Sequence, residues 1–234
     1  MPRSGWLALE GGALVDAIRL RAEGRRMSRQ QLDPDREARF WDGVAQATRF
    51  FMGEADVQRA LHKLVRLLDD AHIPYAVVGA MALNEYGYRR VTVDVDILLT
   101  SQGLESLRAL AFGRGYAEQF PGSRGLRDVE HGVPIDVLIA GEYPGDGRPK
   151  PVKFPDPAEV AIRGVRAALL PLPRLVELKL ASGISAPHRL RDLADVLELI
   201  RVADLPAELA DELDPFVREK YLELWRAAQT PDPH

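Results

Sequence analysis

Asp94 and Asp96 stand one residue apart in a segment of β-branched and apolar residues, which predicts a strand over residues 91–99. Side chains two positions apart on a strand leave the same face, with Cα atoms about 6.5 to 7 Å apart. Two carboxylates about 5 Å apart repel each other by about 3 kcal/mol at an effective dielectric constant near 20. A divalent cation would remove this repulsion, so the pair predicts a metal site.

Asp136 is a third carboxylate, set among the apolar residues of a second predicted strand over residues 133–139. If the two strands pair side by side, all three carboxylates can share one face of a sheet. Carboxylate oxygens suit Mg²⁺ or Mn²⁺, and two such ions about 4 Å apart can align a nucleophile and a leaving group at phosphorus. The three aspartates therefore predict phosphoryl or nucleotidyl transfer from a nucleoside triphosphate (NTP). The alternative is that they are ordinary polar positions on half-exposed strands.

Gly79 follows a short apolar segment, residues 75–78, and precedes a predicted helix over residues 80–87. The backbone N–H groups at the start of a helix can bind phosphate. Arg89 and Arg90 precede the acidic strand and could bind a triphosphate or an RNA backbone. For the glycine and the arginines taken singly, ordinary turn geometry is the alternative explanation.

The elements that must position these residues indicate an α+β protein with a small mixed β-sheet flanked by N-terminal and C-terminal helices. Proline, glycine and helix-capping residues give the predicted boundaries. We expect an N-terminal helical extension (1–53), a sheet domain (54–171) and a C-terminal helical region packed on the core (172–234). Helices are predicted at 12–31, 35–52, 56–72, 80–87, 102–113, 173–183, 187–202 and 215–229, further strands at 125–131 and 162–170, and a loop at 141–157.

Composition excludes several classes of function. The chain of 234 residues has no cysteine, which excludes disulfides, thiolate zinc sites and cysteine nucleophiles. No apolar run approaches the length of a membrane span, so we expect a cytoplasmic protein without a membrane partner. The net charge of −4 argues against a protein that mainly coats nucleic acid. The arginines between residues 19 and 29 fit a solvated helix face. The five histidines lack a metal-binding spacing, although His131 could approach Asp136.

The segment from Gly79 to Asp96 resembles the nucleotidyltransferase superfamily that shares its palm-like fold with DNA polymerase β. That pattern is a glycine turn, a short helix, a strand with D-x-D and a later acidic residue, here Asp136. Its finer form, G-x-x-A-L…Y-G…R-x-T-x-D-x-D, is similar to the AbiEii-type branch of bacterial toxins. Many members have Gly or Ser where this chain has Ala80. The resemblance thus implies that main-chain N–H groups of Gly79 and Ala80 bind the phosphates.

A second resemblance lies downstream, where Leu178-Lys179-Leu180-Ala181 is followed by Arg191-Asp192-Leu193-Ala194-Asp195. Members of this branch carry a similar K-x-x-A and R-D-x-x-D. The resemblance implies that Lys179 faces the nucleotide phosphates and that Asp192 holds or orients it. From the residues alone, Lys179 lies in an apolar helix and needs a partner such as Asp192. The alternative is that Lys179 reaches solvent while Arg191 and Asp195 form a surface pair.

Together these features predict a metal-dependent nucleotidyltransferase that moves a nucleoside monophosphate from an NTP to a hydroxyl group. Asp94, Asp96 and Asp136 would bind Mg²⁺ or Mn²⁺, and Gly79, Ala80, Arg90, Lys179 and Asp192 would bind the nucleotide. The resemblance implies the toxin of a toxin–antitoxin pair, with tRNA or another RNA as acceptor and a cognate antitoxin protein as partner. Two alternatives stay open. One is transfer to a small molecule such as an aminoglycoside, and the other is an inactive protein that binds nucleotide or a partner.

Overall fold

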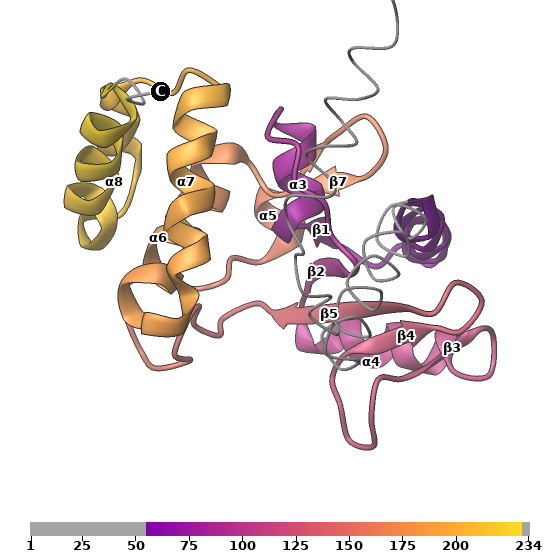
Figure 1. Ribbon diagram of the computed structural model, residues 1–234. Coiled ribbons are helices and arrows are strands. Elements are labelled where there is room, and N and C mark those ends of the chain that lie inside the picture. Colours follow the sequence, from indigo (N-terminus) through magenta and orange to yellow (C-terminus); the bar gives the residue numbers. More distant parts are fainter. Residues whose placement is uncertain (1–54, 231–234) are drawn as a thin grey trace, which may run out of the picture. The chain divides into compact units, whose positions relative to one another are not determined.

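Seven strands form one mixed sheet in the computed structural model, which describes residues 55–230 (Figure 1). The order across the sheet is β3-β4-β5-β2-β1-β7-β6. β2 runs parallel to β5, and β1 runs parallel to β7, while the other neighbours are antiparallel. The strands are β1 (Ala76–Val77), β2 (Val95–Leu99), β3 (Tyr116–Glu118), β4 (Leu126–Asp128), β5 (Val133–Ile139), β6 (Ile162–Arg163) and β7 (Ala168–Leu169).

Helices precede, interrupt and follow the sheet, which confirms the predicted α+β class (Figure 1). A helix over residues 55–70 leads into β1. The others are α3 (Gly79–Glu85), α4 (Ser101–Ala111), α5 (Pro157–Val160), α6 (Leu172–Ser185), α7 (Leu190–Val202) and α8 (Pro215–Ala228), with 3-10 turns at Pro187–Arg189 and Ala207–Glu212. Within residues 55–230, no helix combines the length and the apolar content that a membrane crossing requires.

The acidic strand is shorter than predicted, because β2 begins at Val95 and Asp94 lies just before it. Its neighbour β1 pairs only at Ala76 and Val77, after which the chain turns into α3 at Gly79. Residues 91–94 therefore have no antiparallel partner on that side. The prediction that Asp94 and Asp96 lie on one strand is wrong for Asp94, which lies outside β2.

Other predicted boundaries also shift. The strand expected at 125–131 ends at Asp128, and the one expected at 162–170 is the antiparallel pair β6 and β7. The expected loop at 141–157 ends in the short helix α5, and β3 and the turn at Ala207–Glu212 were not predicted. The helices expected at 12–31 and 35–52, the extension 1–53 and the arginine cluster lie outside the described residues.

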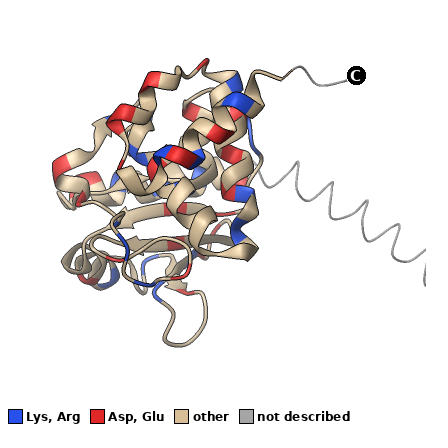
Figure 2. Cartoon of the chain, turned by 90° about the vertical axis from the view of Figure 1, so that its left-hand side faces the viewer, with Lys and Arg blue, Asp and Glu red and all other residues tan. Residues whose placement is uncertain are grey.

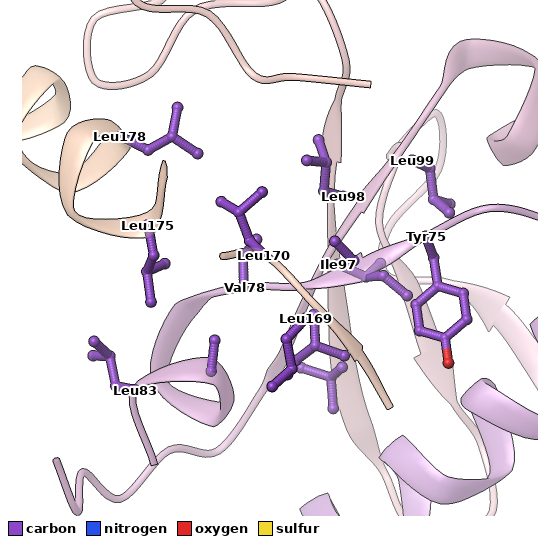
Figure 3. Close-up of a cluster of buried hydrophobic side chains, with 14 of the residues drawn as sticks. Tyr75, Val78, Leu83, Ile97, Leu98, Leu99, Leu169, Leu170, Leu175 and Leu178 are labelled. Atoms are coloured by element: carbon purple, nitrogen blue, oxygen red, sulfur yellow. The ribbon is translucent and has the colours of Figure 1, made fainter. Parts of the chain in front are cut away.

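The hydrophobic core joins the sheet to the C-terminal helices. β2 contributes four fully buried residues, Val95, Ile97, Leu98 and Leu99. Leu175 and Leu178 of α6 belong to the same cluster as Val78, Leu98 and Leu170 (Figure 3). This packing fixes α6, which carries Lys179, against the end of the sheet that carries the aspartates.

An ion-pair cluster around the buried Asp128 joins the 55–70 helix to β4 and the following turn. Lys63 Nζ donates to Asp128 Oδ1 at 2.5 Å and to Glu130 Oε2 at 3.0 Å, and His131 Nδ1 lies 2.5 Å from Asp128 Oδ2. His131 therefore pairs with Asp128, and the suggestion that it approaches Asp136 is wrong. Burial would raise the pKa of Asp128, but the hydrogen bonds and charges of Lys63 and His131 outweigh it and lower that pKa.

Asp128→Asn should lower the free energy of unfolding by about 3 kcal/mol at pH 7, because it leaves the Lys63 ammonium beside a buried neutral group. In the unsubstituted protein the stabilisation is present above the ordinary aspartate pKa of 3.8 and is lost as the pH falls through the lowered folded pKa. Urea unfolding at several pH values measures both effects. Glu130→Gln removes the exposed partner of the same lysine and should cost less than about 1 kcal/mol; equal losses would contradict this explanation.

Candidate active site

A cleft of about 620 Å³ lies where the sheet meets α6 and α7, and it is lined by Asp94, Asp96 and Asp136. β2 and β5 pair in parallel with Asp96 directly opposite Asp136. Residues opposite each other on adjacent strands project from the same face, and adjacent strands lie about 4.8 Å apart. The sheet therefore brings together two carboxylates that are 40 positions apart in the sequence.

Asp94 joins this pair from the segment before β2, where its Oδ1 accepts a hydrogen bond from the Thr92 hydroxyl. Asp136 is held from the other side, because its Oδ1 accepts a hydrogen bond from Gln119 Nε2 at 2.7 Å. The same amide also reaches the Ile135 carbonyl at 3.1 Å. Gln119 was not among the residues predicted for the site, since a neutral amide next to a short strand carries no charge pattern that would mark it.

The carboxylate of Asp96 carries the strongest electrostatic signal in the cleft. Burial, followed by the negative charges of Asp94 and Asp136, raises the pKa of Asp96 to about 7, against the opposing charges of Lys179 and Arg189. Burial and two neighbouring carboxylates both disfavour the negative charge of Asp96, and a nearby cation would offset both effects. The three aspartates thus form a site whose charge favours an additional cation.

The three carboxylates are spread rather than closely clustered. Within residues 55–230, Asp128, Glu130 and His131 are the one set of three potential ligands whose atoms all lie within 4.8 Å of one another. That set already holds the Lys63 ammonium between its two carboxylates, so its positive charge is supplied by the protein. The wider spacing of Asp94, Asp96 and Asp136 suits ions such as Mg²⁺, which keep several waters and substrate oxygens as ligands.

Gly79 lies directly against the Asp96 carboxylate. A Cβ atom at this position would be 1.8 Å from Asp96 Oδ2, and the residue has φ of +60°, a conformation that favours glycine. Gly79 and Ala80 begin α3 and line the cleft, and no side chain caps this helix start. Their backbone N–H groups have no partner within the helix. The backbone N–H donors of Gly79 and Ala80 thus lie next to the Asp96 carboxylate, as expected from the sequence.

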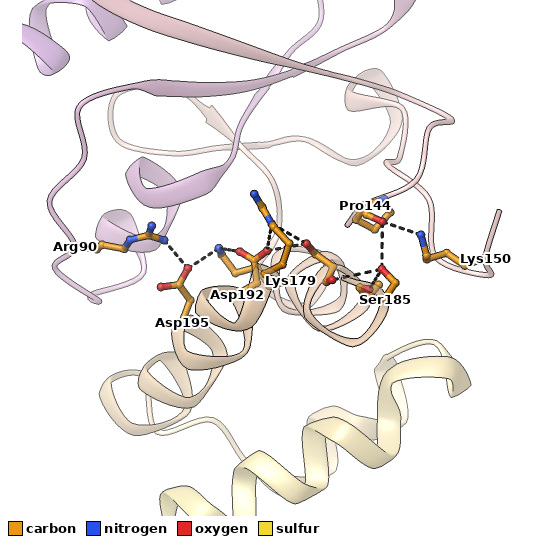
Figure 4. Close-up of polar contacts among 10 residues, drawn as sticks. Arg90, Pro144, Lys150, Lys179, Ser185, Asp192 and Asp195 are labelled. Carbon is orange, nitrogen blue, oxygen red and sulfur yellow. Dashed lines mark hydrogen bonds and ion pairs between the residues drawn. The ribbon is translucent and has the colours of Figure 1, made fainter. Parts of the chain in front are cut away.

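Lys179 lies in a buried ionic network with two aspartates (Figure 4). Its Nζ is 3.1 Å from Asp192 Oδ1 and 2.7 Å from Asp195 Oδ2, and the residue is 7% exposed. Asp192 is therefore a partner, as expected, and the alternative in which Lys179 reaches solvent is excluded. Burial would raise the pKa of Asp192, but the charge of Lys179 and the hydrogen bond from Ser182 outweigh it and lower that pKa.

Asp195 occupies a more central place than the sequence indicated. Besides Lys179, it accepts a hydrogen bond from Arg90 Nη1 at 2.5 Å, and it is 1% exposed (Figure 4). Asp195 is therefore not the surface partner of Arg191. The Arg90–Asp195 ion pair connects the segment before Asp94 to α7. The Arg90 backbone N–H also donates a hydrogen bond to Asn84 Oδ1 at 2.6 Å. The eight residues predicted to bind metal or nucleotide thus all line one cleft, whereas Arg89 is not among its lining residues.

No protein-family model matches the chain, and no curated protein matches its sequence. Among solved structures, the chain is similar to ANT(2″)-Ia in complex with adenylyl-2″-tobramycin, at 14% identity and a TM-score of 0.44, over 74% of this chain and 98% of that one. A proposed nucleotidyltransferase from H. pylori matches at 16% identity and a TM-score of 0.44, over 75% and 93%. JHP933 from Helicobacter pylori matches at 16% and 0.44, over 75% and 90%. Similarity at this level assigns no function to the chain.

Proposed function

We propose that this protein is a metal-dependent nucleotidyltransferase, which moves a nucleoside monophosphate from an NTP to a hydroxyl acceptor and releases pyrophosphate. The observation that carries the proposal is the meeting of Asp94, Asp96 and Asp136 in one cleft that also contains the start of α3 and Lys179. A binding module has no need for three converging carboxylates, which favours an enzyme over the inactive alternative.

Asp94 and Asp96 would bind the metal ions, and Asp136 would complete the second metal site. The donor set fits Mg²⁺ or Mn²⁺, because all three ligands are carboxylates, and burial together with the charges of Asp94 and Asp136 raises the pKa of Asp96. When bound, the ions neutralise the charge that develops on the transferred phosphate. Asp136 would also receive the proton of the attacking hydroxyl. Gln119, which donates to Asp136, would fix the direction of that carboxylate.

The backbone N–H groups of Gly79 and Ala80 would bind the triphosphate, with Lys179 as the nearby positive charge. Asp192 and Asp195 hold the Lys179 side chain at the cleft and form ion pairs with it in a buried position. Arg90 is already paired with Asp195, so its proposed contact with the nucleotide would use the donors that this pair leaves open.

The distribution of charge in the cleft favours an anionic acceptor such as RNA over a polycationic small molecule. Apart from the three proposed metal ligands, the lining carboxylates are paired: Glu142 with Arg124 at 2.6 Å, and Asp192 with Lys179 and Arg189. Arg191 also lines the cleft and forms no ion pair with any described residue. A polycationic acceptor such as an aminoglycoside would need carboxylates that this cleft does not offer. Outside the cleft both signs of charge are interspersed over the helices (Figure 2).

The role of a toxin with a cognate antitoxin, and a tRNA acceptor, rest on the AbiEii-like motifs around Gly79, Asp96 and Lys179. The absence of cysteine agrees with the proposed cytoplasmic location. Growth arrest on expression in a bacterial host, relieved by Asp94→Asn, is the outcome that supports the toxin role. Arrest that persists with the substituted protein would separate toxicity from transfer.

The decisive experiment incubates the protein with each of four labelled NTPs, Mg²⁺ and total tRNA, in parallel with a panel of aminoglycosides. We expect labelling of RNA, and we expect Asp94→Asn or Asp136→Asn to reduce its rate at least about 10³-fold, which corresponds to about 4 kcal/mol of transition-state stabilisation. Exposed Asp211, which lies outside the cleft, provides the control Asp211→Asn, whose rate should be unchanged. Labelling that survives loss of both aspartates would overturn the proposal.

A further inference from the structure

Tyr143 is a half-exposed aromatic residue that lines the cleft without packing against the hydrophobic core. Phe154, at the other end of the same loop, does pack against the core. The ring of Tyr143 is therefore not required to complete the core. An aromatic ring that lines a cleft and is not used in core packing can contribute to the binding of a planar ligand.

The loop that carries Tyr143 is fixed on both sides. Backbone hydrogen bonds join Glu142 and Gly141 to Phe154. Lys150 Nζ donates to the Pro144 carbonyl at 2.7 Å and to Asp146 Oδ1 at 2.6 Å, and Ser185 of α6 reaches the same carbonyl (Figure 4). A Cβ at Gly145 would lie 2.3 Å from Ser185 Oγ, so the loop packs closely against α6. Tyr143 is thus presented on an anchored loop.

Two lysine ammonium groups lie over the Tyr143 ring. Lys150 Nζ and Lys153 Nζ lie 5.7 Å and 5.5 Å from the ring centroid. Lys153 is exposed and forms no ion pair with any described residue, whereas Lys150 is paired with Asp146. An aromatic ring beside an unpaired cation is a combination that can bind single-stranded nucleic acid, because a base stacks on the ring and a phosphate lies against the cation.

Tyr143 lies on the loop that follows the strand of Asp136. Gly79 follows β1, Asp96 lies on β2, Asp136 lies on β5, and these strands are consecutive in the order β1-β2-β5. The loop with Tyr143 directly follows β5 and packs against α6, the helix that also carries Lys179. Because Asp136 is the residue proposed to receive the proton of the attacking hydroxyl, we assign a base stacked on Tyr143 to the acceptor.

We infer that Tyr143 is a nucleobase-stacking platform for a single-stranded RNA acceptor, with Lys153 as a contact to its backbone phosphates. The assignment of the base to the acceptor, and not to the NTP, rests on the proposed function. Binding of RNA to the ring does not rest on it, and the two can be tested apart.

Tyr143→Ala should weaken the binding of a fluorescent single-stranded oligoribonucleotide about 5- to 150-fold, as measured by fluorescence anisotropy without NTP. Tyr143→Phe keeps the ring and should retain the affinity. Lys153→Gln should flatten the dependence of log affinity on log salt by about 0.7. Phe216→Ala, which removes an exposed aromatic side chain outside the cleft, is the matched control and should have no effect.

Thermal stabilisation by Mg²⁺ with a non-hydrolysable NTP serves as the second measurement, and Tyr143→Ala should leave it unchanged. If the substitution instead removes this stabilisation and spares RNA binding, the ring holds the base of the NTP and the inference is wrong. An effect on neither ligand would also overturn it. Tyr143-dependent RNA binding by a protein that shows no metal or NTP response would sustain the inference and reject the proposed function.

Discussion

Asp96→Asn is expected to raise the free energy of unfolding of the metal-free protein by about 4 kcal/mol at pH 8, while abolishing its response to Mg²⁺ and its transferase activity. The pKa of Asp96 is about 7 in the folded protein and 3.8 ordinarily. The folded state therefore binds the proton more tightly, and this stabilisation is lost as the pH rises from about 4 to above 7. The difference between these two pKa values, at about 1.4 kcal/mol per pKa unit, gives the expected gain in the free energy of unfolding.

Denaturant unfolding from pH 4 to pH 8, with and without Mg²⁺, measures this effect. The unsubstituted protein should lose stability toward pH 8 and recover it when Mg²⁺ is added, because the cation replaces the proton as the partner of the carboxylate. Asp96→Asn should show neither change. Asp211→Asn, at an exposed aspartate, should alter stability by less than about 0.5 kcal/mol. A substituted protein that Mg²⁺ still stabilises fully would show that the cation binds elsewhere.

The strands that carry the site could be predicted because their residues follow patterns of burial. Asp96 and Asp136 each stand among β-branched and apolar residues, so both strands were expected. The start of β2 could not be read from this pattern. It depends on which neighbouring strands can pair with residues 91–94, and this tertiary context is not visible in the local sequence.

Tertiary contacts determine the parts of the site that the sequence did not reveal. Arg191 and Asp195 have the spacing of a surface pair on a helix, yet Asp195 faces Lys179 and Arg90 because α7 packs against α6 on that side. The amide of Gln119 reaches Asp136 only because β3, β4 and β5 are adjacent, and because Gly125 has no side chain in its path. Neither contact leaves a local signal in the sequence.

Gly79→Ala should lower the free energy of unfolding by at least about 3 kcal/mol and abolish transfer. A left-handed backbone at a residue with a side chain costs about 1 to 2 kcal/mol. The new Cβ would also lie 1.8 Å from Asp96 Oδ2 and 2.5 Å from Asp96 Cγ, so the carboxylate must rotate away from its present position. Because that carboxylate is the proposed metal ligand, the same movement should weaken Mg²⁺ binding, which thermal shift measurements at increasing Mg²⁺ would detect.

Gly87 separates the two causes, because it has φ of +94° but a Cβ there would meet only Val202 Cγ1 at an ordinary 3.5 Å. Gly87→Ala should therefore show the backbone cost alone and keep its response to Mg²⁺. A double-mutant cycle combines Gly79→Ala with Asp96→Ala. The second substitution removes the two atoms nearest to the new Cβ but leaves the Cβ of residue 96 at 2.8 Å. It should therefore recover about 1 kcal/mol of the stability that Gly79→Ala removes. Additive losses would mean that the strain at Gly79 is independent of Asp96, and that this glycine serves the turn and not the carboxylate.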